Sequence, residues 1–214
     1  MTLSSHKHVL WDWNGTLFDD AHLCMEVMNL SLKKRKLPLL TTERYQEIFG
    51  FPVMDYYRRA GFDFSRESFE TAGTEFIVEY EKRKFECLLQ PAAKEILHRI
   101  RDAGITQSVL SAYQQNTLEE VIRHFGLERY FVRLVGLQDH YAGGKIDHGR
   151  RWIREAGHNP SDVLFIGDTV HDFEVAQAMG TDCILIHGGH NSLPRLKSCG
   201  VLVLSSLAEL VREL

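Results

Sequence analysis

Short, continuous apolar runs alternate with amphipathic stretches over most of the chain, and this alternation limits the fold more than any other feature of the sequence. Six runs are predicted to be strands, namely residues 9–11, 105–110, 132–137, 163–166, 183–186 and 201–204. Apolar runs without in–out alternation are typical of parallel strands covered on both faces. Because helical segments separate these runs, the pattern predicts a Rossmann-like, doubly wound parallel α/β sheet.

The segments between these runs carry the signals of helices. We expect helices over residues 92–103, 117–125, 148–156 and 172–179, and a last helix that opens at Ser206. Gly157 and Gly180 stand where helix C-terminal caps are expected. Asn116 followed by Glu119 resembles a capping box that begins the second of these helices.

Residues 21–87 break this rhythm, because they show helical periodicity without a strand. Leu23, Val27 and Leu30 recur at helical spacing near the start of the stretch, and the same spacing returns near its end. We therefore expect a core formed by residues 1–19 and 88–214, with a helical cap domain of residues 20–87 inserted after the first strand.

Charge and composition exclude several classes of protein. The 214 residues include 25 Lys and Arg against 29 Asp and Glu, a net charge of −4, whereas nucleic-acid binders usually carry a basic surplus. The four cysteines are far apart and form no CxxC pair, which fits a reducing cytosol. The chain shows neither the apolar stretch of a signal peptide nor a membrane span. We therefore expect a cytoplasmic protein that binds neither nucleic acid nor membrane.

Polar side chains follow the predicted strands at the edge where open parallel sheets bind ligands. Asp12 ends the first strand, Ser111 ends the second, and Lys145 lies in the loop after the third. Asp168 ends the fourth strand, and Asp172 lies in the next turn. Such carboxylates suit Mg²⁺, one of them can attack phosphorus, and a lysine with a hydroxyl can hold phosphoryl oxygens.

This layout closely resembles the haloacid dehalogenase superfamily, and within it the phosphoglycolate phosphatase-like members that have a helical cap. The motifs that carry the resemblance are residues 12–19, Ser111, Lys145 and residues 167–172, with a similar tail at residues 189–196 and 206–210. The resemblance implies a Mg²⁺-dependent phosphatase that acts on a small organic phosphate through an aspartyl-phosphate intermediate. The helical insert then corresponds to the family's cap, which closes over the substrate.

The resemblance also implies a role for each matching residue. Asp12 matches the nucleophile, and Thr16 matches a residue that fixes the nucleophile loop and belongs to the phosphate-binding group. Ser111 and Lys145 match the phosphate-binding pair, and Lys145 also takes part in catalysis.

The same comparison implies a metal site. Asp12 and Asp168 match direct ligands of Mg²⁺, and Asp172 matches an acidic residue that supports the metal or its waters. Asn14 stands at the position whose main-chain carbonyl binds the ion. The resemblance therefore implies Mg²⁺ as the cofactor.

The sequence departs from the family pattern at Asn14, where an aspartic acid–base is usual. An amide can neither protonate a leaving alkoxide nor take a proton from water, and this catalysis contributes about 10²–10⁴-fold. We therefore expect slow turnover of alkyl phosphates unless another group or a good leaving group compensates. Two alternatives stay open: a phosphate-binding or regulatory protein with little turnover, and a hydrolase of carbon–phosphorus or carbon–halogen bonds.

Three histidines near the predicted site have open roles. His171 could serve as a substitute acid–base, and His187 and His190 could line the site or bind a transition metal. Exposure to solvent is the simpler interpretation of each. The sequence also leaves open the identity of the substrate, the cap residues that contact it and the oligomeric state.

Overall fold

A parallel sheet forms the centre of the computed structural model, which describes residues 5–137 and 144–212. Within these residues the sheet has six strands in the order β5-β4-β1-β6-β7-β8, and all neighbours are parallel. The strands are β1 (His8–Trp11), β4 (Thr106–Gln114), β5 (Arg133–Leu137), β6 (Val163–Gly167), β7 (Asp182–Ile186) and β8 (Leu202–Leu204). This order, with β1 at the centre, confirms the doubly wound α/β prediction.

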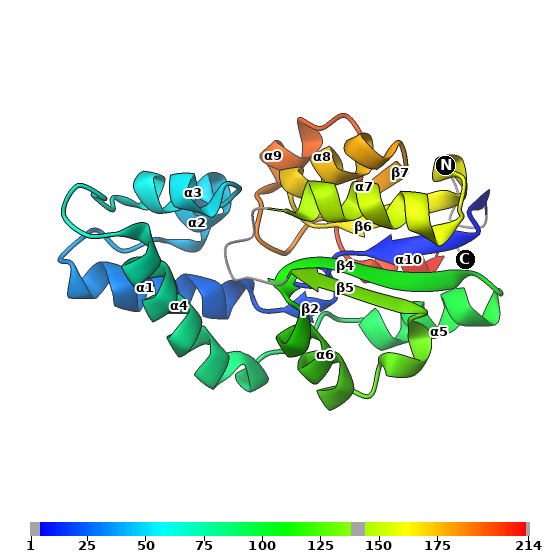
Figure 1. Cartoon of the computed structure of the whole chain (residues 1–214), viewed down its shortest axis with the longest axis horizontal. Coiled ribbons are helices and arrows are strands. Elements are labelled where there is room, and N and C mark those ends of the chain that lie inside the picture. Colours follow the sequence, from blue (N-terminus) through cyan, green and yellow to red (C-terminus); the bar gives the residue numbers. More distant parts are fainter. Residues whose placement is uncertain (1–4, 138–143, 213–214) are drawn as a thin grey trace.

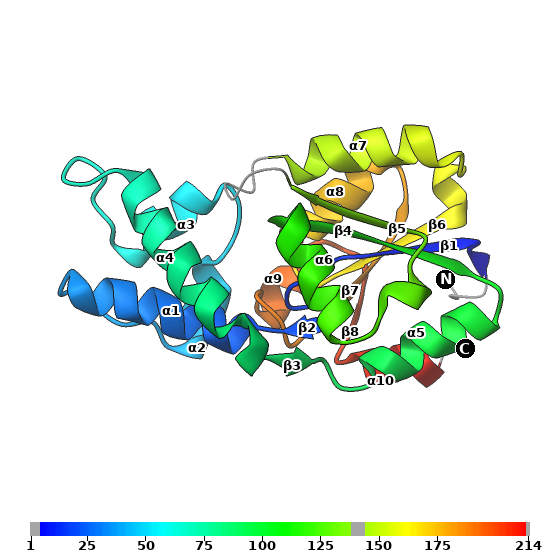
Figure 2. The ribbon, with the colours of Figure 1, turned by 60° about the horizontal axis from the view of Figure 1, so that its bottom comes forward.

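Helices cover both faces of the sheet (Figures 1 and 2). One face carries α5 (Ala93–Asp102), α6 (Gln115–His124) and α10 (Leu207–Arg212), and the other carries α7 (Lys145–Ala156), α8 (Val170–Met179) and α9 (Leu193–Lys197). In β1, Val9 and Trp11 belong to the hydrophobic cluster on the first face, whereas Leu10 belongs to the cluster on the second. Both faces are therefore buried, which is why the strands lack in–out alternation.

Several helix ends differ from the predictions. The capping box predicted at Asn116 is wrong, because β4 runs on to Gln114 and the side chain of Gln114 caps α6 by accepting from the Thr117 amide at 3.0 Å. A capping box is found instead in α8, between Thr169 and Asp172. The predicted caps at Gly157 and Gly180 are confirmed, since both adopt the left-handed conformation that glycine allows.

Four helices form a group beside the sheet (Figures 1 and 2). They are α1 (Ala21–Lys34), α2 (Thr42–Ile48), α3 (Val53–Ala60) and α4 (Phe69–Arg83), and they enclose a hydrophobic cluster of their own. Leu23 and Val27 of α1 are buried as expected, but Leu30 is 51% exposed. The second half of α1 instead buries Met28 and Leu32 against the other three helices.

An antiparallel pair of short strands, which the sequence pattern does not predict, stands where the chain enters and leaves this group. β2 (Phe18–Asp19) pairs with β3 (Leu88–Leu89). The pair holds the two connections side by side, close to the end of β1. The remaining described elements are the short 3-10 helices η2 (Lys84–Glu86), η3 (Glu128–Tyr130) and η4 (Pro160–Asp162). No helix in the described ranges combines the length and the apolar character that crossing a membrane requires.

Candidate active site

Three carboxylates meet at the carboxyl ends of the neighbouring strands β1 and β6. Asp12 follows β1, Asp168 follows β6, and Asp172 stands in the first turn of α8. One oxygen of each carboxylate lies within 4.8 Å of the others, and all three residues are buried. The structure therefore brings together the acidic residues that the sequence placed at this edge.

Lys145 lies among these carboxylates. It is 2% exposed, and its ammonium group donates to Asp12 Oδ1 and, at 2.5 Å, to Asp172 Oδ1. The sequence pattern predicts a loop at Lys145, but the residue is the first of α7. Burial and the two contacts to Asp12 and Asp172 hold the ammonium group beside the acidic cluster.

Thr16 lies between two of the acidic residues. Its hydroxyl is 3.1 Å from Asp12 Oδ2 and 2.9 Å from Asp168 Oδ1. A hydroxyl carries one proton, so Thr16 can donate to only one of these oxygens at a time. The residue therefore orients the two carboxylates, and its assignment to the phosphate-binding group stays a prediction.

Asp172 is held on both of its oxygens. Its Oδ2 accepts from the amides of Asp168 and Thr169 and from the Thr169 hydroxyl at 2.7–3.1 Å, while its Oδ1 accepts from Lys145. A Cβ atom added at Gly167 would lie 2.4 Å from the Asp172 side chain. Glycine at this position therefore lets the end of β6 pass close to the carboxylate.

Two further glycines surround Asp168. A Cβ atom at Gly15 or at Gly189 would collide with its carboxylate. Gly15 also has φ +78°, a conformation that side chains rarely adopt. The loop after β1 and the loop after β7 can therefore both approach Asp168, and the His190 amide donates to Asp168 Oδ2 at 2.6 Å.

Asn14 lies where the acidic cluster meets the four-helix group. Its amide nitrogen donates to Asp20 Oδ2 at 2.8 Å and to the Tyr80 hydroxyl at 3.2 Å. Its oxygen accepts from Ser111 Oγ at 3.4 Å. The side chain thus links the loop after β1, the strand β4 and the helix α4, and Ser111 is brought to the same place as predicted.

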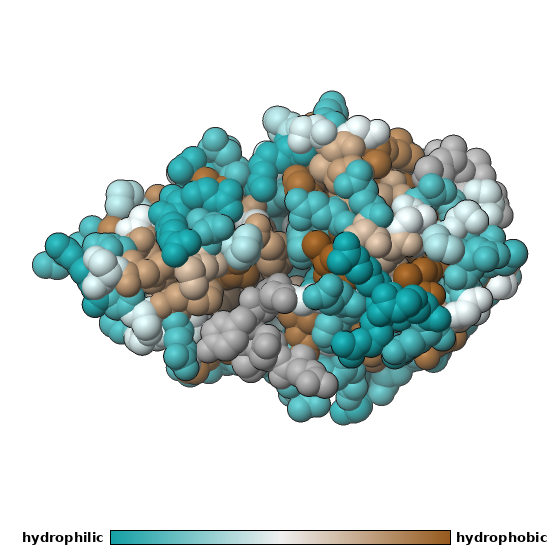
Figure 3. Space-filling model, turned by 45° about the horizontal axis from the view of Figure 1, so that its top comes forward, coloured by the Kyte–Doolittle hydropathy of each residue, from teal (hydrophilic) through white to brown (hydrophobic). Residues whose placement is uncertain are grey.

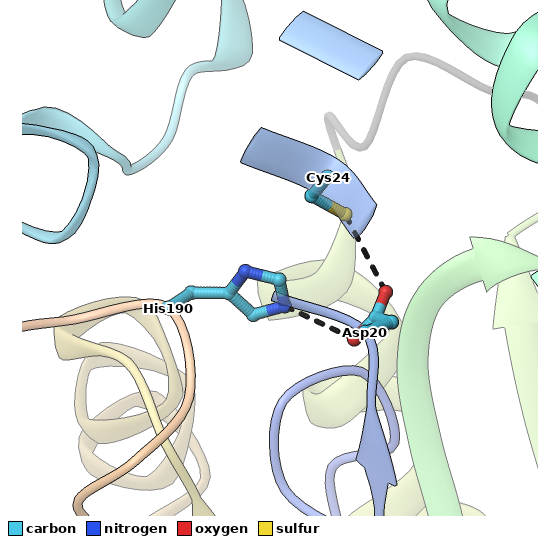
Figure 4. Close-up of side chains that lie close together, drawn as sticks. All are labelled: Asp20, Cys24 and His190. Carbon is cyan, nitrogen blue, oxygen red and sulfur yellow. Dashed lines mark hydrogen bonds and ion pairs between the residues drawn. The ribbon is translucent and has the colours of Figure 1, made fainter. Parts of the chain in front are cut away.

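A second buried cluster, Asp20 with His190 and Cys24, was not predicted (Figure 4). His190 Nε2 lies 3.4 Å from Asp20 Oδ1, and Cys24 Sγ donates to Asp20 Oδ2 at 3.5 Å. Tyr80 of α4 donates to the same Asp20 oxygen at 2.6 Å. The Tyr45 hydroxyl of α2 is 2.7 Å from His190 Nδ1, so helices of the insert close this cluster.

The solvent-exposed interpretation of the histidines is wrong for His190, which is 3% exposed. His171 and His187 are partly buried. The ring of His171 packs against Phe51 and its Nδ1 is 2.9 Å from Glu174. Asp20 directly follows the first motif, and no sequence signal shows that it pairs with a histidine 170 residues further along the chain.

The electrostatics of the first cluster are dominated by burial. Burial, and then the charge of Asp172, raise the pKa of Asp12 to about 8 although Lys145 opposes this change. Burial also raises the pKa of Asp168 to about 6. For Asp172 burial acts in the same direction, but Lys145 and Thr169 outweigh it and lower the pKa. Lys145 pairs with two of the three carboxylates, Asp12 and Asp172, so full ionisation of all three leaves an excess of negative charge.

In the second cluster the opposite charges of Asp20 and His190 balance one another. Burial alone would lower the pKa of His190, but the hydrogen bond and charge of Asp20 raise it to about 9. Burial would raise the pKa of Asp20, but His190, Tyr80 and Asn14 lower it. At neutral pH the two groups therefore form a buried ion pair whose charges cancel.

Comparison with known proteins gives the family context. The sequence matches the family described as "Haloacid dehalogenase-like hydrolase" over residues 9–186. It is 26% identical over 188 residues to the tyrosine-protein kinase PtkA of Mycobacterium tuberculosis, covering 87% of this chain and 64% of that protein. The chain thus spans less than two thirds of PtkA.

Two other proteins are similar over nearly their full length. A phosphoglycolate phosphatase of Vibrio parahaemolyticus is 24% identical over 223 residues, which covers 99% of this chain and 97% of that one. The solved structure of a haloacid dehalogenase-like family hydrolase from Streptococcus pneumoniae superposes with a TM-score of 0.85 at 16% identity, covering 98% and 99% of the two chains. At that identity the superposition shows the fold alone.

Proposed function

The chain belongs to the haloacid dehalogenase-like hydrolase family, and from this premise we propose that it is a Mg²⁺-dependent phosphatase that hydrolyses a small organic phosphate through an aspartyl phosphate on Asp12. The observation that carries the proposal is the buried cluster of Asp12, Asp168 and Asp172 around Lys145 at the carboxyl ends of β1 and β6. A relative named phosphoglycolate phosphatase, similar over nearly the whole chain, supports the phosphatase class.

The donor set fits a divalent cation. Three buried carboxylates face a single lysine, and an excess of buried negative charge is costly unless a cation balances it. Mg²⁺ prefers hard oxygen ligands. Asp12, Asp168 and the main-chain carbonyl of Asn14 would hold the ion, while Asp172 positions Lys145 and the 168–169 main chain. The ion, when bound, supplies positive charge beside the phosphoryl oxygens.

The side chains then have separate tasks in the reaction. The Asp12 carboxylate attacks phosphorus, the ester P–O bond breaks, and its electron pair leaves on the alcohol oxygen. Lys145 and Ser111 donate to the phosphoryl oxygens and stabilise the charge that develops there. Water then attacks the phosphorus of the aspartyl phosphate, and the bond from phosphorus to the Asp12 oxygen breaks. The proton that water loses passes to the alcohol oxygen, so phosphate and alcohol are released and Asp12 is regenerated. Asn14 holds its neighbours in place but transfers no proton.

We further propose that residues 20–87 act as the cap over this site. The support is that Tyr80 and Tyr45, from two different helices of the group α1–α4, reach Asp20 and His190 beside the acidic cluster. The β2–β3 pair joins the two connections of this group to one another. A hydrogen-bonded contact of this kind can close the site against water while leaving the group able to separate from the sheet.

The second candidate is a phosphate-binding or regulatory protein with little turnover, and Asn14 is the observation that favours it. A carbon–phosphorus hydrolase has less support. Such an enzyme would need a lysine of the insert to form a Schiff base with its substrate. Lys33, Lys34 and Lys36 are exposed, and no lysine is among the described residues that line the cavity beside Asn14.

One experiment separates the two candidates. The purified protein is incubated with millimolar Mg²⁺ and acetyl phosphate, whose acetate leaving group needs no proton donor, and released phosphate is measured over many turnovers. The control is Asp12→Asn. We expect multiple turnovers that need Mg²⁺ and are lost in the control. Saturable binding of phosphate without turnover would instead identify a binding protein.

A further inference from the structure

A cavity of about 190 Å³ lies between the group α1–α4 and the carboxyl end of the sheet. In the space-filling view the surface is hollowed between these two parts, and pale brown, hydrophobic side chains gather on the helical side (Figure 3). Phe and Tyr make up eight of the eighteen described residues of its wall, among them Phe49, Tyr56, Phe76 and Tyr113. The wall is therefore suited to a flat apolar group, because aromatic pairs are worth about 0.5–1.5 kcal/mol beyond the burial of their area.

The charges on this wall argue against an anionic organic group. Neither lysine nor arginine is among the described residues that line it, whereas Asp20 and Glu81 are. His190 also lines the cavity, but its positive charge is already paired with Asp20. A carboxylate carried by the substrate in addition to its phosphate, as in phosphoglycolate, would lose its hydration here without gaining a cationic partner, which is strongly unfavourable.

The size of the cavity suits a single ring. An apolar cavity of about 150 Å³ lined by aliphatic and aromatic side chains is enough to bind benzene. The cavity beside Asn14 is slightly larger, and Gly73 of α4 leaves part of its wall bare, since nothing lies within 4 Å of a Cβ atom added there.

The cavity adjoins the reaction centre. Asn14, two residues after Asp12, lines it, and so does Ala112, which directly follows Ser111. A group that fills the cavity would therefore border Asn14 and Ala112, the wall residues that stand close to Asp12 and Ser111 in the sequence.

The side chain of Asn14 limits which leaving groups the reaction can release. An alkoxide is the conjugate base of an alcohol, which is about as weak an acid as water, so it requires a proton donor to leave. A phenolate leaves with a pKa of about 10 and needs far less assistance. The Asn14 amide cannot supply a proton, so the reaction centre favours the same leaving group that the aromatic wall fits.

We propose that the substrate is an aryl monophosphate, a phosphate ester of a phenol, with its ring in the cavity bordered by Asn14, Phe76 and Tyr113. The inference rests on the phosphatase function proposed above and specifies its substrate class. Asp12 forms a bond to phosphorus, the bond from phosphorus to the aryl oxygen breaks, and the electron pair leaves as phenolate. Water hydrolyses the aspartyl phosphate, and the proton it loses converts the phenolate to phenol.

The first test compares leaving groups of matched shape. Steady-state kcat/KM is measured for phenyl phosphate, cyclohexyl phosphate, phosphoglycolate and acetyl phosphate. We expect phenyl phosphate to exceed cyclohexyl phosphate and phosphoglycolate by at least about 100-fold, the lower range of general acid catalysis. In Asn14→Asp we expect cyclohexyl phosphate turnover to rise by about 10²–10⁴-fold and phenyl phosphate turnover to rise by less than about tenfold.

The second test fills the cavity. Gly73→Leu places a side chain in the open part of the wall, and Gly73→Ala adds one methyl group at a helical position that favours alanine. We expect the ratio of kcat/KM for phenyl phosphate to that for acetyl phosphate to fall at least about tenfold in Gly73→Leu, a change of about 1.4 kcal/mol. Val78→Leu is the matched control, because Val78 is on the same helix, 50% exposed and not among the cavity residues.

The outcomes separate this inference from the phosphatase function. Turnover of acetyl phosphate with equal rates on phenyl phosphate and phosphoglycolate overturns the aryl specificity and leaves the phosphatase function intact. Absence of acetyl phosphate turnover overturns both proposals.

A phosphotyrosyl peptide is tested beside phenyl phosphate. Faster turnover of the peptide identifies a protein-borne phenol as the source of the ring, and slower turnover identifies a small molecule.

Discussion

Two buried clusters of acidic residues lie next to one another in this protein, and they differ in charge balance. Lys145 is paired with Asp12 and Asp172, and Asp168 is the third carboxylate beside them, so the first cluster has more negative than positive charge. Asp20 in the second cluster is matched by His190 and by donors from Asn14, Tyr80 and the Gly15 amide.

This difference in charge balance indicates which of the two clusters can bind a metal ion. Both are groups of potential ligands by geometry, because in each the ligand atoms lie within 4.8 Å of one another. Only the first lacks the positive charge that would balance it, so it is the cluster that we propose as the site of a divalent cation. In the second cluster a cation would have to displace a protonated histidine, and we expect this cluster to hold the insert against the sheet instead.

The largest effect that tests this contrast is the loss of catalysis in Asp12→Asn. Removal of the nucleophile should lower kcat for acetyl phosphate by at least about 10⁴-fold, the scale seen when a nucleophile is removed from other hydrolases. Phosphate release is the measurement. The variant should unfold no more easily than the parent without Mg²⁺, since burial disfavours the Asp12 charge. Residual turnover near the parent rate would show that another group attacks phosphorus.

Substitutions in the second cluster should change the stability of the folded protein. Asp20→Asn leaves the His190 charge buried without its partner, so we expect the free energy of unfolding to fall by about 3–5 kcal/mol in urea unfolding. The double variant Asp20→Asn/His190→Gln should recover part of this loss, because no unpaired charge remains. If the single and double variants are equally stable, the two residues do not form an ion pair.

Alkaline pH should weaken both clusters, and Mg²⁺ should rescue only the first. The pKa of His190 is raised from 6.5 to about 9, so its stabilisation is complete below pH 6.5 and is lost as the pH rises through about 9. The pKa of Asp12 is raised from 3.8 to about 8, so between these pH values the folded state keeps a proton that the unfolded state has released. The free energy of unfolding therefore falls over this range and stops falling above about pH 8.

The measurement is urea unfolding between pH 6.5 and 9. Without Mg²⁺ the free energy of unfolding should fall, with His190 contributing on the order of 3 kcal/mol. Millimolar Mg²⁺ should restore the part that comes from Asp12, by up to about 2.7 kcal/mol at an ion concentration of 100 times Kd. Asp168→Asn should abolish the restoration, whereas Cys24→Ala should keep it. A restoration that persists in Asp168→Asn would place the ion elsewhere.

The smallest expected effect is that of Cys24→Ala. The thiol donates a single weak hydrogen bond to Asp20 at 3.5 Å, and Asp20 keeps its other donors. We expect a loss of about 1 kcal/mol or less in urea unfolding. A much larger loss, or binding of Zn²⁺ that disappears in this variant, would mean that the second cluster is a metal site after all.

The sheet and the first cluster could be predicted for a shared reason. Val9, Leu10 and Trp11 are apolar in sequence because β1 is buried on both faces, so the strand is visible as an uninterrupted run. The carboxyl ends of parallel strands lie at one edge of the sheet. Asp12 and Asp168 each stand at the end of an apolar run, and this is enough to predict that the two lie near one another. The roles of these residues in catalysis stay predictions.

The helix ends and the second cluster could not be predicted from the sequence in the same way. Gln114 caps α6 because β4 continues to it, and the extent of pairing with β5 decides that. His190 in a glycine-containing loop has the local sequence of an exposed residue. It is buried because Asp20, Phe49 and Tyr45, all distant in sequence, surround it.

By itself the sequence determined the doubly wound sheet, the helical character of the insert and the meeting of Asp12, Asp168, Asp172 and Lys145, because these follow from periodicity and from the common edge of parallel strands. The tertiary structure decided what surrounds that edge: the pairing of Asp20 with His190, the hydrogen bonds of Asn14 and the aromatic wall of the cavity. These depend on how the helices of the insert pack against the sheet, and such contacts join residues whose separation in sequence carries no periodic signal.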